Sequence, residues 1–157
     1  MKKVVVAIDG PAAAGKSTIA KKVALIKGYT YIDTGAMYRA FTWYCLQKNV
    51  DCQDEKACVA LIPEVKIELK PNNIVLCNNI DVTTAIRQTD VSGNVSYIAS
   101  YKDIRLALVD LQRAMAKNTS VVMDGRDIGT NVIKDAELKI RLRVSADVRV
   151  TLASAIT

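Results

Sequence analysis

Residues 10–17 constrain the fold more than any other part of the chain. They read GPAAAGKS and match the pattern G-x-x-x-x-G-K-[ST] in full. The apolar run at residues 4–8 is typical of a strand buried in a parallel sheet, and residues 17–27 have the apolar spacing of a helix. Such a strand, turn and helix form a P-loop, whose backbone N–H groups surround phosphate oxygens. We therefore predict an α/β fold that binds a phosphorylated ligand; the alternative is a merely tight strand-to-helix turn.

Each residue type in the motif has a chemical reason. Gly10 and Gly15 let the backbone approach a phosphate closely, Lys16 can bridge the β- and γ-phosphates, and the Ser17 hydroxyl can bind Mg²⁺. We expect Mg²⁺ to arrive with ATP. The predicted ATP-binding residues are Gly10, Pro11, Ala12, Ala13, Ala14, Gly15, Lys16, Ser17 and Thr18.

A second segment, DTGAMYR at residues 33–39, also follows an apolar run. We expect Asp33 to end a strand and Thr34 to cap the helix that carries Arg39. An arginine one turn into a helix can bind a phosphate with two donors. Taken alone, the segment also fits an ordinary helix cap with a solvated arginine.

A third segment, VVMDGRDIGT at residues 121–130, has the form of a Walker B strand. Asp124 ends the apolar run, where a carboxylate can orient Mg²⁺, often through water. Arg126 and Asp127 then lie beside the site. Because parallel strands end at one edge of their sheet, we expect all three segments to meet there. A strand followed by an Asp-Gly turn is nevertheless common.

The rest of the chain alternates between strand and helix patterns. Residues 65–69 and 73–82 read as short strands separated by Asn-rich turns, which predicts a small antiparallel insert at 51–89. Residues 95–116 read as helical with a break near Lys102. We expect one core domain, residues 1–50 and 90–157, that carries this insert.

Composition excludes several classes of function. The chain has no histidine, which excludes Ser-His-Asp hydrolysis and His-ligated zinc sites. Its four cysteines lack C-x-x-C spacing, so we expect free thiols in a reducing compartment. No apolar stretch approaches the ~20 residues that a membrane span needs. The net charge of +6 suits an anionic partner, but the basic residues are dispersed. We expect a cytoplasmic monomer that binds neither nucleic acid nor membrane.

Taken together, five segments resemble the bacterial cytidylate kinases. GRDIGT with DTGAMYR is much more specific than the P-loop, and the resemblance covers residues 4–149. The segments are DGPAAAGKST (9–18), YIDTGAMYRA (31–40), VSYIAS (95–100), DIR (103–105) and VMDGRDIGT (122–130). The resemblance implies a P-loop kinase fold, a three-layer α/β/α core with a parallel sheet and a large insert. It also implies transfer of the γ-phosphoryl group of ATP to CMP or dCMP, giving ADP and CDP or dCDP.

The resemblance also assigns roles to individual residues. Lys16, Arg39 and Arg126 would be catalytic, with the two arginines holding the phosphate of CMP. Thr34 would join the CMP site, and Ser100, Arg105 and Asp127 would recognise cytosine. Cytosine presents an amino donor where uracil presents an oxygen acceptor, which the Asp127 carboxylate would repel. Two alternatives stay open: another P-loop kinase acting on UMP or AMP, and a nucleotide-binding fragment without turnover.

The sequence departs from the family pattern near its end. The family continues into an arginine-rich lid, a helix and a final strand, whereas residues 150–157 carry no charge. We expect residues 145–149 to begin the helix that leads to the lid. Beyond them, either the lid and C-terminal part are missing from a truncated or partly recorded chain, or the chain is a divergent copy. Lid arginines normally stabilise the transition state.

Overall fold

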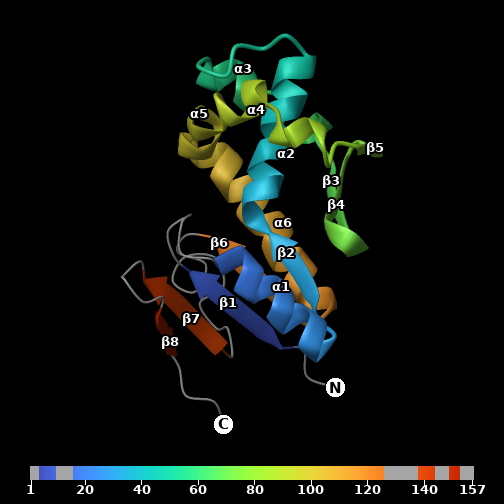
Figure 1. Ribbon diagram of the computed structural model, residues 1–157. Coiled ribbons are helices and arrows are strands. Elements are labelled where there is room, and N and C mark those ends of the chain that lie inside the picture. Colours follow the sequence, from blue (N-terminus) through green and yellow to red (C-terminus); the bar gives the residue numbers. More distant parts are fainter. Residues whose placement is uncertain (1–3, 10–15, 126–137, 144–148, 153–157) are drawn as a thin grey trace. The chain divides into compact units, whose positions relative to one another are not determined.

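The computed structural model describes residues 4–9, 16–125, 138–143 and 149–152 (Figure 1). The chain divides into two compact units. The first, which we call the sheet unit, consists of Met1–Thr34 and Leu111–Thr157. The second, the helical unit, consists of Gly35–Asp110. Each unit is described by itself below.

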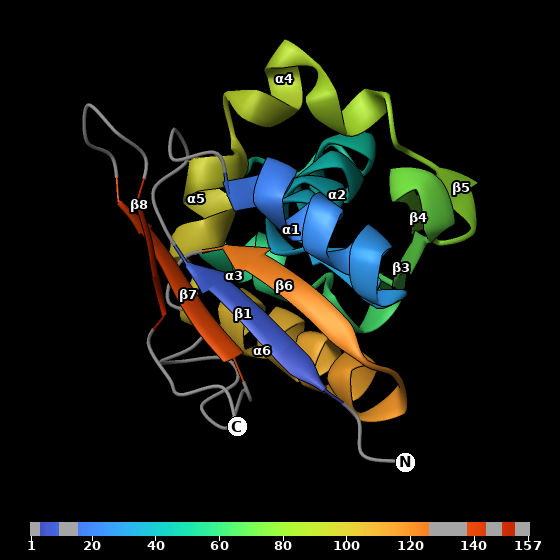
Figure 2. The same cartoon turned by 60° about the horizontal axis from the view of Figure 1, so that its bottom comes forward.

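The sheet unit is built on five strands in the order β2-β6-β1-β7-β8. Figure 2 shows β6, β1, β7 and β8 side by side. Strand β1 pairs in parallel with β6 and β7, and β2 pairs in parallel with β6. The strands are β1 (Val5–Asp9), β2 (Thr30–Asp33), β6 (Val121–Gly125), β7 (Leu138–Arg143) and β8 (Arg149–Leu152). The predicted parallel sheet and α/β fold class are confirmed.

Helix α1 (Lys16–Lys27) packs on this sheet and closes its core. Ala20 and Ala24 lie against Val6, Ile8 and Val122, all of them buried. Small alanines on the inner side of α1 let the helix approach the β-branched strand residues closely. Because β1 and β6 also bury their other residues, the continuous apolar runs in the sequence are explained.

The C-terminal end of α1 is formed by a left-handed glycine. Gly28 has φ of 69°, and the N–H of Tyr29 donates to the carbonyl oxygen of Ala24 at 2.9 Å. This bond is the one that defines a Schellman motif. Glycine adopts this left-handed conformation without steric cost, so it ends the helix here.

The sequence predicts that residues 145–149 begin a helix, and this prediction is wrong for Arg149, which lies in a strand. Arg149–Leu152 forms β8, which pairs antiparallel with β7, so that Arg143 faces Arg149 and Ile140 faces Leu152. Residues 144–148 lie outside the described residues. Two β-branched residues, Val150 and Thr151, favour a strand, and pairing satisfies the backbone groups along the outer side of β7.

The helical unit consists mainly of helices with one small sheet. Helix α2 begins at Thr34 in the sheet unit, and α6 continues from the helical unit into the sheet unit. The helices are α2 (Thr34–Gln47), α3 (Glu55–Val59), α4 (Thr89–Ser92), α5 (Val95–Ser100) and α6 (Lys102–Asn118). The break between α5 and α6 falls at Tyr101, next to the predicted position.

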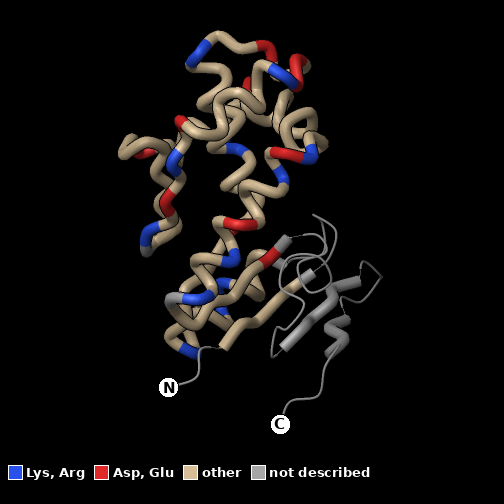
Figure 3. Tube along the Cα trace, turned by 180° about the vertical axis from the view of Figure 1, so that it is seen from behind, with Lys and Arg blue, Asp and Glu red and all other residues tan. Residues whose placement is uncertain are grey.

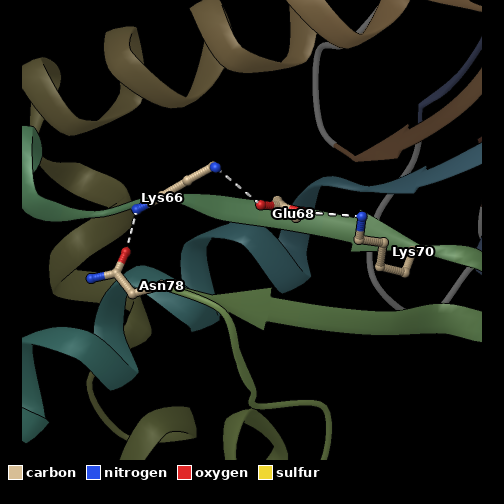
Figure 4. A network of polar contacts seen from close by, with 4 residues as sticks. All are labelled: Lys66, Glu68, Lys70 and Asn78. Atoms are coloured by element: carbon tan, nitrogen blue, oxygen red, sulfur yellow. Dashed lines mark hydrogen bonds and ion pairs between the residues drawn. The ribbon is translucent and has the colours of Figure 1, made fainter.

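The strands of the helical unit are β3 (Ile67–Lys70), β4 (Ile74–Cys77) and β5 (Ile80–Asp81), paired antiparallel as predicted. Asn78 and Asn79 join β4 to β5 with φ of 49° and 67°. The backbone N–H of Lys66 donates to Asn78 Oδ1 at 2.7 Å (Figure 4). The asparagine-rich turns therefore work through the left-handed backbone conformation that asparagine tolerates.

The segment 51–89 contains more than strands. It also holds α3 and short 3-10 turns, η2 (Ile62–Glu64), η3 (Pro71–Asn73) and η4 (Ala85–Arg87), of which the sequence pattern indicated only the turn at Pro71–Asn73. The helical unit includes this segment and extends beyond it at both ends. That the segment is an insert stays a prediction.

All four cysteines are free and buried, and all four lie in the helical unit. Burial raises the pKa of each thiol. In the described part of the chain, no helix has the length and apolar character that crossing a membrane requires.

Candidate functional site

Two carboxylates lie at the same edge of the parallel sheet. Asp33 is the last residue of β2, and its register partner on β6 is Asp124. On the other side of β6, Ile8 of β1 is in register with Asp124. Strand β1 therefore ends at this edge too, and the chain leads from it to α1 through residues 10–15, which lie outside the described residues. The predicted meeting of strand ends is confirmed for β1, β2 and β6.

Asp124 is buried, with 4% of its surface exposed, and it is held at two points. The Tyr31 hydroxyl donates to Asp124 Oδ2 at 2.9 Å, and the Thr34 hydroxyl donates to the Asp124 carbonyl oxygen at 2.6 Å. Thr34 is the first residue of α2, and this bond ties the start of that helix to β6. Thr34 was predicted to cap α2, whereas the bond that its hydroxyl donates in the structure connects α2 to β6.

The sequence analysis missed Tyr31. Alternation along β2 puts Tyr31 and Asp33 on one side of the strand, while Ile32 between them is fully buried. That alternation is the signal that could have associated the tyrosine with the acidic edge. Its hydroxyl fixes the orientation of the Asp124 carboxylate, which is what a ligand-binding acid requires.

The start of α1 presents the second half of the P-loop. Lys16 is the first residue of the helix, and Ser17 and Thr18 follow it with exposed side chains. Lysines are the only charged residues of α1, whose sequence is KSTIAKKVALIK. The helix N-terminus therefore adds its partial positive charge to a basic element, which favours an anion.

The donors at this edge fit a magnesium–nucleotide complex. The Ser17 hydroxyl and the Asp124 carboxylate are oxygen ligands of the type that Mg²⁺ prefers. Within the described ranges, no three His, Cys, Asp or Glu side chains gather to hold a metal ion. Mg²⁺ commonly takes one or two protein ligands and completes its shell with water and substrate phosphates. The donor set therefore suits a metal that arrives with ATP.

In the helical unit, Arg39 is held by neutral acceptors only. Its Nη1 donates to Ser92 Oγ at 2.8 Å and to the Ile86 carbonyl oxygen at 3.3 Å. Among the residues that the structure describes, no carboxylate forms an ion pair with Arg39. The half-buried guanidinium therefore keeps a positive charge that no neighbouring acid neutralises. Such a group is suited to binding an anion.

Arg105 lies beside a second residue of α2. Its guanidinium lies close enough to the Tyr38 hydroxyl to interact with it electrostatically. Burial raises the pKa of Tyr38, and the charge of Arg105 partly opposes that shift. The tyrosine therefore stays protonated near neutral pH. The Arg105 side chain is itself exposed, so part of it is accessible to a ligand.

Ser100 is the last residue of α5 and is exposed. Its hydroxyl donates to the Tyr97 carbonyl oxygen at 2.6 Å. The structure thus gives Ser100 a partner in its own helix. Arg126 and Asp127, the remaining predicted members of the site, lie outside the described residues.

Charge differs between the two units along the described trace (Figure 3). In the helical unit, basic and acidic residues are mixed, as in the part of α6 that belongs to it, KDIRLALVD at residues 102–110. In the sheet unit, α1 carries lysine without any acid. The positive charge next to the P-loop is therefore local and does not depend on the net charge of the chain.

Comparisons with a family model and with individual known proteins all indicate the same family. The family model described as cytidylate kinase matches residues 6–152. The cytidylate kinase of Lactiplantibacillus plantarum is 53% identical over 144 residues, which is 90% of this chain and 63% of that protein. Those of Anoxybacillus flavithermus and Bacillus subtilis are each 50% identical over 151 residues, which is 94% of this chain and 67% of each relative.

The chain thus spans about two thirds of the length of the curated relatives that it matches. The match includes β1, the first turn of α1, α2 with Arg39, and the strand that carries Asp124. On the extent of the family match and an identity of about half, the chain belongs to the cytidylate kinase family.

Proposed function

We propose that this protein transfers the γ-phosphoryl group of ATP to CMP or dCMP, giving ADP and CDP or dCDP. The observation that carries the proposal is Arg39. It is a half-buried arginine with two neutral acceptors, in the DTGAMYR segment of a cytidylate kinase family member. Among the described residues no acid pairs with this partly buried guanidinium, so binding of an anion would stabilise it. The phosphate of a nucleoside monophosphate is such an anion.

On the donor side, residues 10–18 would hold the ATP phosphates. Lys16 would neutralise charge on the β- and γ-phosphates, and the Ser17 hydroxyl and Asp124 carboxylate would hold Mg²⁺ directly or through water. Bound there, the metal would withdraw charge from the phosphates. The partly buried Tyr31–Asp124 hydrogen bond supports this role because it fixes the carboxylate before the nucleotide binds.

On the acceptor side, Arg39 and Arg126 would hold the phosphate of CMP, and Thr34 would lie at the same end of α2. Arg105 and Asp127 would recognise cytosine, the arginine donating to its acceptors and the carboxylate accepting from the N4 amino group. The Tyr38 contact supports the role of Arg105 because it restricts the guanidinium. The Ser100 hydroxyl donates to the Tyr97 carbonyl oxygen and keeps its lone pairs, with which it would accept from the amino group of cytosine.

Catalysis would rest on positioning and charge. Lys16 and the two acceptor-side arginines would bring the two phosphates into line and stabilise the negative charge of the transition state. No dedicated general base is required, since the acceptor is already an ionised phosphate oxygen. The chemistry follows the general pattern of phosphoryl transfer.

A thermal melt of this chain with CMP, UMP or AMP tests the proposal. Ligand at ~100 times its Kd should stabilise the folded state by ~2.7 kcal/mol, a rise of several degrees in Tm. We expect CMP and dCMP to raise Tm and UMP and AMP to leave it near the ligand-free value. A two-state melt that CMP does not shift would refute the acceptor site.

Binding and turnover are then separated by following ADP release with ATP and CMP present. ADP that forms only when CMP is added would support the transfer reaction. CMP binding with no ADP above the background of the Lys16→Ala variant would favour a nucleotide-binding protein without turnover. A shift of equal size with UMP would instead favour a kinase of broader base preference.

A further inference from the structure

We propose that Ser92 is a positioning residue, which orients Arg39 so that one edge of its guanidinium group faces the phosphate of a nucleoside monophosphate. The inference rests on the proposed function and adds to it a residue that does not itself touch substrate. It starts from the two hydrogen bonds of a single nitrogen atom of Arg39.

The first step concerns the donors of Arg39. A guanidinium group has five N–H donors, of which Nη1 carries two. Ser92 Oγ and the Ile86 carbonyl oxygen are two acceptors for this one nitrogen, at 2.8 and 3.3 Å. No described residue accepts from Nε or Nη2, whose three donors lie along the opposite edge. That edge has the geometry that binds two oxygens of a phosphate at once.

The second step concerns how the acceptors are held. Ile86 and Val91 are buried, with 1% and 0% of their surface exposed, and they anchor η4 and α4 on either side of the contact. The backbone N–H of Ser92 donates to the Gln88 carbonyl oxygen at 3.0 Å. Both acceptors are thus fixed by buried neighbours, although Ser92 itself is exposed.

The third step concerns charge. An acidic acceptor at position 92 would hold Arg39 more tightly but would also neutralise it and repel a phosphate. A serine hydroxyl restricts rotation of the guanidinium group and leaves its charge intact. An ordered arginine loses less conformational entropy when it binds, so affinity for the anion rises.

The experiment is a set of CMP titrations with the same chain, by calorimetry. Ser92→Ala removes the hydroxyl, and Ser92→Thr keeps it. Thr89→Ala is the matched control, since it removes a hydroxyl from the same short helix where no side-chain bond is formed within the described structure. Kd for ATP is measured in parallel, because a variant that is merely misfolded loses both ligands.

We expect Ser92→Ala to weaken CMP binding about three- to tenfold, and Ser92→Thr and Thr89→Ala to stay within about twofold of the parent chain. ATP binding should not change in any of them. An unchanged Kd for CMP in Ser92→Ala would overturn the inference, as would a loss that Ser92→Thr fails to restore. If the parent chain does not bind CMP, it is the proposed function that fails.

Discussion

At the scale of single residues, the bond between Thr34 and Asp124 is the most buried polar contact at the sheet edge. Thr34 has 5% of its surface exposed, and its hydroxyl donates to the Asp124 carbonyl oxygen at 2.6 Å. We predict that Thr34→Val, which keeps the shape of the side chain, lowers the free energy of unfolding by ~1–2 kcal/mol, because the buried carbonyl oxygen loses this donor. Urea unfolding followed by circular dichroism measures the change.

Thr42→Val is the matched control on the same helix. The Thr42 hydroxyl is also buried, but it donates at 2.8 Å to the carbonyl oxygen of Tyr38, four residues earlier in α2. That oxygen already accepts a helical N–H, so the substitution should cost less than ~0.5 kcal/mol. Equal costs in the two variants would show that the Thr34 bond has no special importance at the sheet edge.

The buried thiols give the protein a predictable response to alkaline pH. Burial raises the pKa of Cys52 and of Cys77 to about 11 from an ordinary value of 9.0. Below pH 9 both states keep the thiol protons. Between about pH 9 and 11 the unfolded chain loses them while the folded chain keeps them, so the free energy of unfolding falls as pH rises.

A comparison of slopes tests this prediction. Cys77 is fully buried on β4, and Cys77→Ala removes one of the shifted thiols. The variant should lose stability less steeply between pH 9 and 10.5, by up to ~1.4 kcal/mol per pH unit, whatever its stability at neutral pH. Urea unfolding at several pH values gives both slopes. Parallel curves for parent and variant would contradict the assignment.

At the scale of elements, the turn between β4 and β5 allows the effect of backbone conformation on stability to be measured apart from the effect of side-chain hydrogen bonds. Asn78 and Asn79 both have positive φ, as in the two-residue turn that favours Asn-Gly. Asn79 is exposed and forms no side-chain hydrogen bond with the described residues. We therefore predict that Asn79→Gly is neutral or stabilises by up to ~0.5 kcal/mol in urea unfolding.

Asn78→Gly should have the opposite effect although its backbone is equally suited to glycine. The Asn78 side chain accepts from the Lys66 N–H at 2.7 Å (Figure 4). It also donates to the Glu64 carbonyl oxygen at 2.9 Å. Its loss should cost ~1 kcal/mol, since both bonds fix the start of β3. If both glycine variants behave alike, the turn depends on φ alone.

The elements that were predicted well are those whose conformation is determined by residues within the element itself. The β-branched run of β1, the alanine-lined side of α1 and Gly28 each specify their own conformation, and the structure has them as expected. Strand β8 was missed because it depends on the partner that it pairs with, at a distance along the chain. The short helices α3 and α4 carry too few residues to show a helical period.

The same division holds for the candidate site. Asp33, Arg39 and Asp124 could be found because they follow recognisable local patterns at strand ends. Tyr31 offered only the alternation of β2 as a signal, because its partner Asp124 lies 93 positions away. Ser92 offered none, since its contact with Arg39 joins residues 53 positions apart. The hydrogen bonds of both side chains are identified only in the folded chain.

At the scale of the whole molecule, the proposed donor residues lie in one unit, whereas the proposed acceptor residues come from both. Lys16, Ser17 and Asp124 belong to the sheet unit, as do Thr34, Arg126 and Asp127 of the acceptor set, whereas Arg39 and Arg105 belong to the helical unit. Protection within the helical unit should therefore follow CMP and not ATP. Hydrogen–deuterium exchange, read by mass spectrometry on peptides from each unit, resolves this.

We predict that CMP slows exchange in α2, α4 and the first turns of α6, where Arg39, Ser92 and Arg105 lie. ATP with Mg²⁺ should instead slow exchange at the start of α1 and the end of β6. UMP at the same concentration is the control and should leave α4 unprotected. Protection by CMP confined to α1 would mean that CMP occupies the P-loop as a competitor of ATP. The assignment of Arg39 and Arg105 to the acceptor would then be wrong, because a ligand that orders the helical unit must bind it.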